Sequence, residues 1–377
     1  MVTLTERALR VETISSESEL AGLAGSWDEL VRAMPRPSPF LLHTWLLEWW
    51  RHYGDGDELA VHVAYRGDQL VGALPLCTRR RLGLRVSEFV GGTWALLADV
   101  LVAPDAERSV RTALVDHAFS GEYDFANLFG LPGSSRLLAE LPSEALRLVE
   151  RLEAPVLDLD AGWDAAYRRK FSSKARSERA RRRRQLEALG RIDVAAARTR
   201  EELAAALEDA FHVYALRWQG RRDASGFVTP TGLRFHRAAL TRLADEDVSR
   251  VLTIRLDDRP IAFALYLQLC GRAYGVTTAF DPAYARYAPG TEAKLLSLEA
   301  AAAEGVTRAE ILGAAAEHKQ RLTDRYEPIY QGIGLGRTLR GRIAAEALLG
   351  GIQLRRRLKR STTAKRLYYR MPHLGRG

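Results

Sequence analysis

The sequence predicts an α+β protein built from two consecutive copies of one unit, each a mixed β-sheet flanked by helices, with a basic helical tail. In each half, helices precede a strand, a tight polar turn and a second strand. Asp68 and Val71 of the first hairpin recur as Asp258 and Ile261 of the second, 190 residues later. A repeat of several elements in the same order indicates a duplicated unit.

The length of the chain agrees with two domains, since a single hydrophobic core stops growing well below 377 residues. We expect a first domain over residues 1–158, a second over 159–336 and the tail over 337–377.

Apolar spacing and turn residues place the elements of the first half. The segment FLLHTWLLEWWRH predicts an amphipathic helix, and Ser26 is a suitable N-cap for the helix before it. The predicted helices are 26–34, 40–52 and 109–119, and the predicted strands are 59–65, 69–76, 87–90, 99–102 and 124–129.

The second half repeats this order. Its predicted helices are 162–190, 201–217, 232–244 and 290–304, and its predicted strands are 251–256, 261–269, 272–279 and 308–312. We expect the tail to be helical from residue 338.

The positive charge of the chain is concentrated in two basic stretches. The chain has a net charge of +9 and is 47% hydrophobic, which is ordinary for a globular protein. Residues 168–184 hold ten Lys/Arg and one acid, and residues 337–370 hold eleven Lys/Arg and one acid. These stretches carry +9 and +10, so the rest of the chain carries −10. We expect anionic partners for the two stretches, without DNA among them.

Several classes of protein are not expected. The chain has no run of 18 apolar residues and no signal-peptide pattern at its start, which predicts a cytoplasmic protein. Cys77 and Cys270 lie in apolar strand-like runs and are expected to be buried reduced thiols. No Cys/His pair has ligand spacing, so no metal is expected.

Four stretches of the chain resemble one protein family. They are PSPFLLHTWLLEWWRHYG (37–54), LVGALPL (70–76), SSKARSERARRRRQLEALG (172–190), and APGTEAKLLSLEAAAAEG (288–305) followed by EILGAAAEHKQRL (310–322). In this order they resemble the GNAT acyltransferases, in particular the CelD-like branch, which is related to the Fem-type aminoacyl transferases. The resemblance implies a tandem pair of GNAT-like domains. It also implies that the second half holds the donor and reaction site, and that the first half is a degenerate copy.

The segment around Gly290 is the predicted donor site. A helix start favours the pyrophosphate of acyl-CoA, because backbone N–H groups and the helix dipole point at the anion. Gly290 lets the backbone approach closely, and Thr291 is a candidate cap. The family's loop has the form Gln/Arg-x-x-Gly-x-Gly/Ala. Here Arg286 is kept, but a single glycine remains and is shifted by one place. This departure leaves an aminoacyl-tRNA donor open beside acyl-CoA, and an ordinary Pro-Gly turn as well.

Acyl transfer needs a hydrogen-bond donor that stabilises the developing oxyanion and a base that takes a proton from the acceptor. Three residues are candidate catalytic groups, each with a structural alternative. They are Tyr274 (an acid or a core aromatic), Asp281 (a base or a turn residue before proline) and His318 (a base or a solvated loop residue). Four more are candidates for substrate binding. They are Tyr284 and Tyr287 (cleft lining or turn packing), Lys319 (an anion ligand or a solvated residue) and Arg217 (an anion clamp or a side chain over an aromatic ring).

The two basic stretches have open alternatives too. Arg176 and Arg179 share a helix face with Arg183, and this stripe either grips the phosphates of a CoA or tRNA donor or forms a solvated face. The tail either lies on anionic lipid at the inner face of the membrane, packs on the body or binds RNA. Its apolar residues are Leu339, Ile343, Ala347, Leu348 and Ile352.

Three functions are compatible with these features. The first is transfer of an acyl group, in particular acetyl, from acyl-CoA to an amine or hydroxyl of a sugar, polysaccharide precursor or similar acceptor. The resemblance alone implies that acceptor class. The second is a Fem-like transfer from aminoacyl-tRNA, which predicts salt-dependent tRNA binding. The third is a non-catalytic protein that recruits partners to membrane or RNA, because no residue is an unmistakable base.

Overall fold

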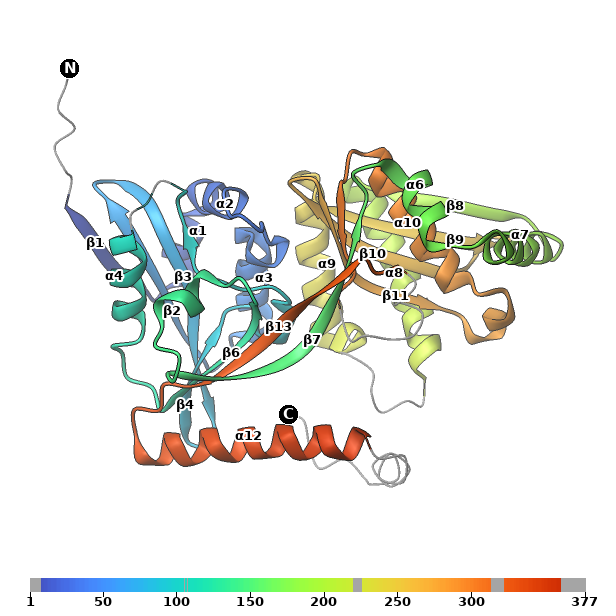
Figure 1. The fold of residues 1–377 in the computed structure, drawn as a ribbon. Coiled ribbons are helices and arrows are strands. Elements are labelled where there is room, and N and C mark those ends of the chain that lie inside the picture. Colours follow the sequence, from blue (N-terminus) through green and yellow to red (C-terminus); the bar gives the residue numbers. More distant parts are fainter. Residues whose placement is uncertain (1–7, 105, 107, 220–225, 313–321, 361–377) are drawn as a thin grey trace, which may run out of the picture.

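A computed structural model describes residues 8–104, 106, 108–219, 226–312 and 322–360 of the chain. Within these residues a single mixed sheet of 13 strands runs through the molecule. Helices gather around the two ends of this sheet and form two lobes (Figure 1).

The first lobe holds the N-terminal end of the sheet. Its strands are β1 (Leu9–Ile14), β2 (Glu58–Arg66), β3 (Gln69–Arg81), β4 (Leu84–Phe89), β5 (Leu101–Val102) and β6 (Phe125–Pro132). Its helices are α1 (Glu17–Ala21), α2 (Ala24–Arg32), α3 (His43–Tyr53), α4 (Arg108–Ala118) and α5 (Arg136–Glu140), with 3-10 turns at Pro39–Leu41 and Gly92–Trp94.

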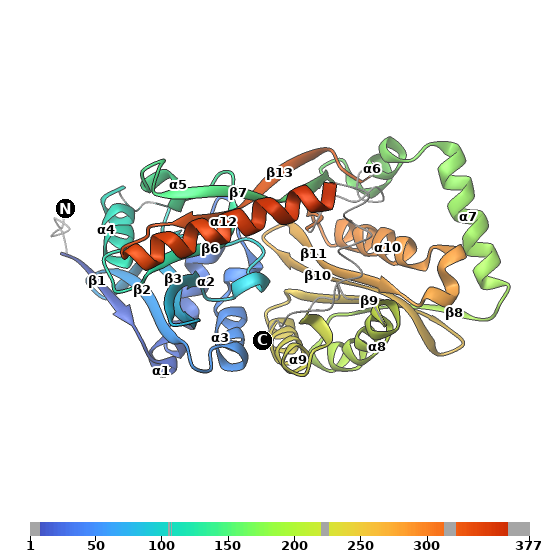
Figure 2. The same ribbon diagram turned by 90° about the horizontal axis from the view of Figure 1, so that it is seen from below.

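The second lobe holds the other end of the sheet. Its strands are β8 (Ile192–Ala197), β9 (Ser249–Leu256), β10 (Arg259–Leu269), β11 (Arg272–Phe280) and β12 (Arg308–Glu310). Its helices are α6 (Gly162–Lys170), α7 (Ser173–Glu187), α8 (Arg200–Trp218), α9 (Pro230–Asp245) and α10 (Pro289–Ala303), with 3-10 turns at Gly226–Val228 and Pro282–Tyr287. Helices α8 and α9 cover one face of the sheet and α10 covers the other (Figure 2).

Two long strands join the lobes. β7 (Leu146–Asp158) and β13 (Arg325–Gly334) pair along their whole shared length. β13 also pairs with β6 of the first lobe, and β7 pairs with β12 of the second. The resulting strand order is β1-β2-β3-β4-β6-β13-β7-β12-β11-β10-β9-β8, with β5 beside β3. β7 and β13 are not among the strands predicted from the sequence. The predicted domain limits of 1–158 and 159–336 stay a prediction. β13 lies within the second of these ranges but pairs with β6 of the first lobe.

An aromatic cluster fixes the contact between the lobes. Trp45 of α3 lies edge-on to Phe235 of α9, with ring centroids 5.0 Å apart. Trp94 lies 4.4 Å from the ring of His236 in the same way. Burial lowers the pKa of His236 to about 3, so its ring is neutral near neutral pH and packs as an aromatic group. The burial of these rings favours one arrangement of the lobes.

The basic tail forms a helix that returns to the first lobe. This helix, α12 (Leu339–Arg360), runs along the lobe's lower side in Figure 1. Ala345, Leu349 and Ile352 on its inner side are buried against the sheet, in a cluster that includes Val86 and Phe125. The part of the tail before residue 361 therefore packs on the body, which was one of the three alternatives.

Two local predictions differ from the structure. The helix predicted over 162–190 is divided into α6 and α7, because Phe171 leaves the helical conformation and the Ser172 hydroxyl accepts from Ala175 N (3.3 Å) as a new N-cap. The prediction that both cysteines are buried is wrong for Cys270. It is exposed in the β10–β11 turn at a φ of 48°, whereas Cys77 is buried.

Candidate active site

β11 and β12 separate in the middle of the second lobe. The two strands are parallel and pair over three positions only, 272–274 with 308–310. β11 continues to Phe280, whereas the chain after β12 follows β7, where Ile311 N donates to Pro155 O (2.8 Å). Parallel strands that part in this way leave backbone N–H and C=O groups of the facing edges without a ladder partner.

A β-bulge lies on β11 at this opening. In the pairing of β10 with β11, Leu265 faces Thr277 and Tyr266 faces Gly275, so Val276 has no opposite residue. A bulge turns backbone groups out of the ladder and often lies beside an active site. Backbone N–H groups at such a place can stabilise an oxyanion.

A small pocket lies at the opening, which we call the β11–β12 pocket. Its volume is about 40 Å³, room for only a few non-hydrogen atoms. Gly275 forms part of its wall, and a methyl group there would lie 3.7 Å from Glu310 O, an ordinary contact distance. The pocket is lined by Ala264, Leu265, Tyr266, Ala273, Gly275, Thr278, Lys294, Ser297, Leu298, Ala309, Glu310 and Ile311.

Glu310, which ends β12 and lines this pocket, is fully buried. Three arginines form ion pairs with it: Arg36 at 2.6 Å, Arg308 at 2.9 Å and Arg272 at 3.3 Å. Arg36 belongs to the first lobe, where it follows α2, so this network joins the lobes at the pocket. Glu310 is not among the site residues predicted from the sequence. Its one local signal is the strand spacing of Arg308 and Glu310, which places both side chains on one face.

Tyr274 precedes the pocket wall on β11 and is fully buried. Its hydroxyl donates to Pro37 O of the first lobe. Burial raises the pKa of Tyr274, so the phenol keeps its proton near neutral pH. These surroundings match the alternative in which Tyr274 is a core aromatic residue, and its hydroxyl forms a hydrogen bond between the two lobes.

Asp281 and Tyr284 lie at the end of β11, before α10. The carboxylate of Asp281 is buried, accepts from Ala283 N (2.9 Å) and forms an ion pair with Arg259 (2.7 Å). The Arg259 guanidinium also lies over the Tyr284 ring, 5.9 Å from its centroid. Asp281 thus caps the 3-10 turn, as its turn alternative predicts.

The start of α10 has an unusual backbone. Ala288 is the N-cap at a φ of +55°, and Thr291 N and Glu292 N both donate to its carbonyl (3.0 and 3.1 Å). Thr291 is therefore a residue of the first turn, and the expectation that it caps the helix is wrong. A Cβ on Gly290 would come within 2.7 Å of Phe280 Cδ1, so the glycine lets α10 pack directly on the end of β11.

Two of the predicted binding residues flank this turn. Arg286 lies over the ring of Tyr287, with its guanidinium carbon 4.6 Å from the centroid. Tyr287 is largely buried and contributes to a cluster with Ile254 and Ala293. The packing alternative accounts for the Tyr287 ring.

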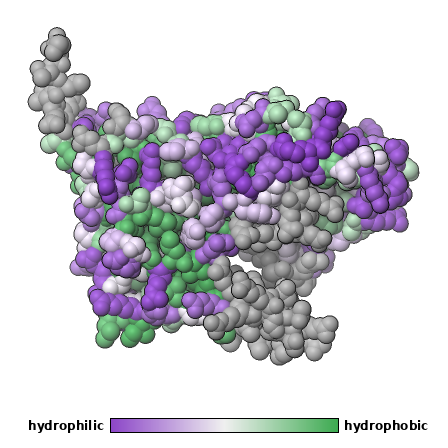
Figure 3. Space-filling view, viewed as in Figure 1, coloured by the Kyte–Doolittle hydropathy of each residue, from purple (hydrophilic) through white to green (hydrophobic). Residues whose placement is uncertain are grey.

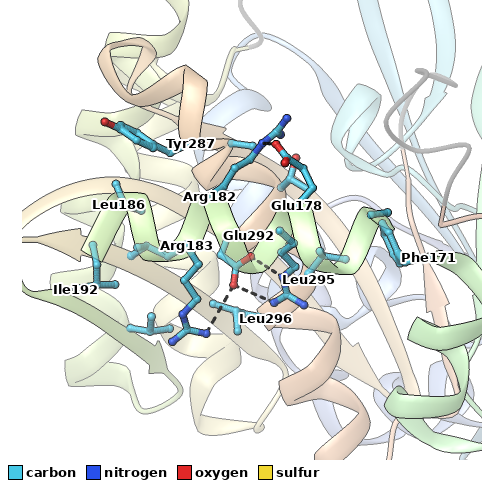
Figure 4. A pocket seen from close by; sticks show the side chains of 16 residues that line it. Phe171, Glu178, Arg182, Arg183, Leu186, Ile192, Tyr287, Glu292, Leu295 and Leu296 are labelled. Atoms are coloured by element: carbon cyan, nitrogen blue, oxygen red, sulfur yellow. Dashed lines mark hydrogen bonds and ion pairs between the residues drawn. The ribbon is translucent and has the colours of Figure 1, made fainter. Parts of the chain in front are cut away.

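The arginines of α7 face a second pocket, of about 150 Å³, between α7 and the start of α10. Arg179 holds Glu292 of α10 through two hydrogen bonds (2.6 and 2.9 Å). In Figure 4 Arg182 points to Glu178, while Arg183 points toward Glu292. Arg176, the other predicted phosphate ligand, donates to Phe171 O (2.5 Å). The structure thus brings Arg179 and Thr291 to one pocket, where Glu292 of α10 binds Arg179 of α7.

The remaining predicted residues lie elsewhere. The Arg217 guanidinium stands over the rings of Phe280 (4.9 Å) and Trp218 (5.7 Å), as its aromatic alternative predicts. His318 and Lys319 lie outside the described residues.

Two general findings bear on the class of protein. Across the described ranges, no three His, Cys, Asp or Glu side chains form a group that could hold a metal ion. Among the helices of those same ranges, none has the length and hydropathy required to cross a bilayer.

Comparison with known proteins identifies the domain type. Residues 173–320 match the model of the acetyltransferase (GNAT) domain family. No curated protein matches the chain by sequence.

Solved structures share the fold at low sequence identity. FemX is 13% identical with a TM-score of 0.60, covering 86% of this chain and 96% of its own. The C-terminal domain of an Agrobacterium fabrum protein that bears the name lysylphosphatidylglycerol synthetase is 12% identical, with a TM-score of 0.53 and coverages of 90% and 97%. A Bacteroides thetaiotaomicron protein of unknown function is 14% identical, with a TM-score of 0.53 and coverages of 85% and 99%.

The GNAT fold predicted from the sequence is thus confirmed, as a mixed sheet with flanking helices. The family match shows that the chain is an acyltransferase. The predicted assignment to the CelD-like branch stays a prediction.

Proposed function

We propose that this chain transfers a small acyl group, in particular acetyl, from acyl-CoA to an amine or hydroxyl of a sugar, polysaccharide precursor or similar small acceptor. The observation that carries the proposal is the β11–β12 pocket, which opens where two parallel strands part beside α10. The GNAT match over residues 173–320 supports the reaction class. The acceptor class rests on the sequence resemblance.

The donor fits the second lobe in two places. At the start of α10, the positive end of the helix dipole favours the pyrophosphate, and Gly290 brings this helix start onto the end of β11. At the opening, the edge of β11 beyond Tyr274, where β12 no longer pairs with it, offers backbone groups to an extended amide-bearing arm. The acyl group then enters the β11–β12 pocket, whose volume of about 40 Å³ suits a small acyl group.

The chemistry in this proposal depends on position and on backbone dipoles. The acceptor nitrogen or oxygen attacks the thioester carbon, and the carbonyl oxygen gains charge. The C–S bond then breaks, and the proton that the acceptor loses protonates the leaving thiolate, so the products are the acylated acceptor and CoA. The backbone at the Val276 bulge stabilises that oxyanion. The buried acids nearby, Glu310 and Asp281, already form ion pairs with arginines. A general base contributes roughly 10²–10⁴-fold, so we assign the larger part to positioning and oxyanion stabilisation.

A Fem-like transfer from aminoacyl-tRNA is the second candidate. The fold similarity to FemX and the arginine-rich α7 favour it. Acid partners of Arg179, Arg182 and Arg183 weigh against it, because they neutralise part of the charge that would meet RNA phosphates.

The test measures binding of acetyl-CoA and of bulk tRNA by calorimetry, at low and moderate salt, to the full chain and to a graded pair of variants. A Cβ at residue 275 makes no close backbone contact, so Gly275→Ala adds one atom to the pocket wall and Gly275→Val adds a larger side chain there. Gly25→Ala, on the exposed side of α2 with no neighbour within 4 Å, is the matched control.

We expect saturable acetyl-CoA binding that weakens from wild type to Gly275→Ala to Gly275→Val, while Gly25→Ala binds as wild type does. Gly275→Ala should also unfold at the same or a higher urea concentration, since alanine is favoured over glycine in a strand by roughly 0.5–1 kcal/mol. Salt-sensitive tRNA binding without acetyl-CoA binding would replace this proposal with the Fem-like one. Binding of neither would overturn this proposal and the Fem-like one alike.

A further inference from the structure

Helix α12 has apolar residues on two opposite sides. On the inner side, Ala345, Leu349 and Ile352 are buried against the first lobe. On the outer side, Leu339, Ile343 and Leu354 are 76%, 63% and 57% exposed. Packing on the lobe accounts for the first side and leaves the second without an explanation.

The outer residues form a continuous stripe. Positions 339, 343, 347, 350 and 354 follow each other at intervals of three or four residues, which places them on one face of an α-helix. We call this stripe of Leu339, Ile343, Ala347, Gly350 and Leu354 the outer α12 face. Ala347 and Gly350 are small, so Leu339, Ile343 and Leu354 provide most of the apolar surface of this face.

The charges beside the outer α12 face are mostly positive. Arg340, Arg342 and Arg355 flank it and are exposed. Glu346 is the one acid of α12 and pairs with Arg147 of β7 (3.2 Å). Asp124 holds Arg340 at the start of the helix through a 2.7 Å ion pair and leaves much of its side chain exposed. An apolar stripe between arginines matches the boundary between acyl chains and anionic headgroups.

A hairpin of the first lobe extends the same surface. Leu84 of β4 packs on the cluster that holds the inner side of α12. Two residues earlier, Leu82 at the β3–β4 turn is fully exposed at a φ of 50°. Arg80 and Arg81 beside it are half-exposed or more. In Figure 3, hydrophobic and hydrophilic residues alternate along the lower edge of the first lobe, where α12 lies.

We propose that the outer α12 face, together with Leu82, docks on an anionic bilayer surface and holds the enzyme there. Leu339, Ile343, Leu354 and Leu82 enter the interfacial layer, and the flanking arginines meet lipid phosphates. A second copy of the chain fits this face less well, because it would bring like-charged arginines together. RNA would use the arginines and leave the apolar stripe in water. The inference does not depend on the proposed acyl donor or acceptor.

The test measures sedimentation of the full-length protein with vesicles of phosphatidylcholine alone and with vesicles of phosphatidylcholine mixed with anionic phosphatidylglycerol, because basic segments bind the negative surface potential of anionic lipids. The variant is the double change Ile343→Gln with Leu354→Gln. Both side chains are exposed, so the fold should be kept, which circular dichroism and the unfolding midpoint check. Leu189→Gln, at an exposed leucine after α7, is the matched control.

We expect wild type and Leu189→Gln to bind the anionic vesicles and not the vesicles of pure phosphatidylcholine. This binding should weaken at high salt. The double variant should bind them about tenfold or more weakly, since the transfer of apolar groups into the interface is lost. Equal vesicle binding by the double variant would overturn the proposal, as would no binding by wild type. A dimer in light scattering that the double variant abolishes would assign the face to a second copy instead. Loss of RNA binding in the double variant, without vesicle binding by wild type, would assign it to RNA.

Discussion

Glu310→Gln tests the network that joins the two lobes at the candidate site. The change keeps the size of the side chain but removes a buried negative charge. Arg36, Arg272 and Arg308 then surround a neutral amide, and Glu327 is the remaining acid that pairs with two of them. Removal of one partner from a buried ion pair leaves uncompensated charge away from water.

The loss should be large for a single side chain. Breaking a buried pair costs about 3–5 kcal/mol, against a total stability of roughly 5–15 kcal/mol for a folded domain. Arg272 and Arg308 are partly exposed and can turn toward water, which places the expected loss at the lower end, about 3 kcal/mol. Arg36 is the most deeply buried of the three and lies across the lobe contact.

Urea unfolding of the full chain measures this loss, with Asp245→Asn as the control. Asp245 pairs with Arg200 at the surface, where both side chains are half-exposed, so its loss should stay within about 1 kcal/mol. A double-mutant cycle with Arg36→Gln isolates the pair across the lobes. A loss for Glu310→Gln no greater than that of the control, or an Arg36–Glu310 coupling near zero, would refute the reasoning.

Three further predictions concern packing and protonation. Gly290→Ala should lower the free energy of unfolding by about 1–3 kcal/mol and weaken acetyl-CoA binding, because its methyl group meets the Phe280 ring. Phe280→Leu in the same chain should restore part of the stability and part of the binding, which urea unfolding and calorimetry measure. Burial raises the pKa of Asp28 to about 6, so folding favours its protonated form and the stability it contributes is lost as pH rises from about 4 to above 6. In urea titrations between pH 4 and 7, Asp28→Asn should remove ~2–3 kcal/mol of the change in unfolding free energy with pH. If the unfolding free energies of wild type and variant changed in parallel with pH, the prediction would be contradicted. The lowered pKa of His236 has the opposite sign, because the unfolded chain binds the proton first. Stability should therefore fall as pH drops below about 6.5, and His236→Phe should unfold with a weaker acid dependence.

Local signals predicted much of the second lobe correctly. The alternation of β9 and β10 around Asp257-Asp258, whose φ values of 47° and 66° suit a tight hairpin turn, lies in the residues themselves. The helix opened by Pro289-Gly290 was predicted within one residue of its observed start. Its capping residue was not, since Ala288 adopts a positive φ that alanine rarely takes.

The crossing strands show why other elements were missed. β7 mixes charged and apolar residues over 13 positions and contains Pro155, and β13 contains Pro328 and two glycines, so neither has the composition of a typical central strand. Each is a strand because it pairs with the other and with a lobe on its far edge. The pairing partner lies more than 160 residues away, and no local pattern specifies it.

The sequence by itself determined the repeated helix and hairpin units, the GNAT character of the second half and the basic character of α7 and α12. The repeated units and the basic stretches follow from side-chain periodicity, turn residues and composition, all of which act over a few neighbouring residues, whereas the GNAT character rests on the resemblance of four stretches to that family. Tertiary structure alone decided that Glu310 meets Arg36, that Tyr274 meets Pro37 and that α12 buries one apolar side and exposes the other. Each of these depends on which surfaces, far apart in the chain, exclude water together, and that is a property of the packed whole.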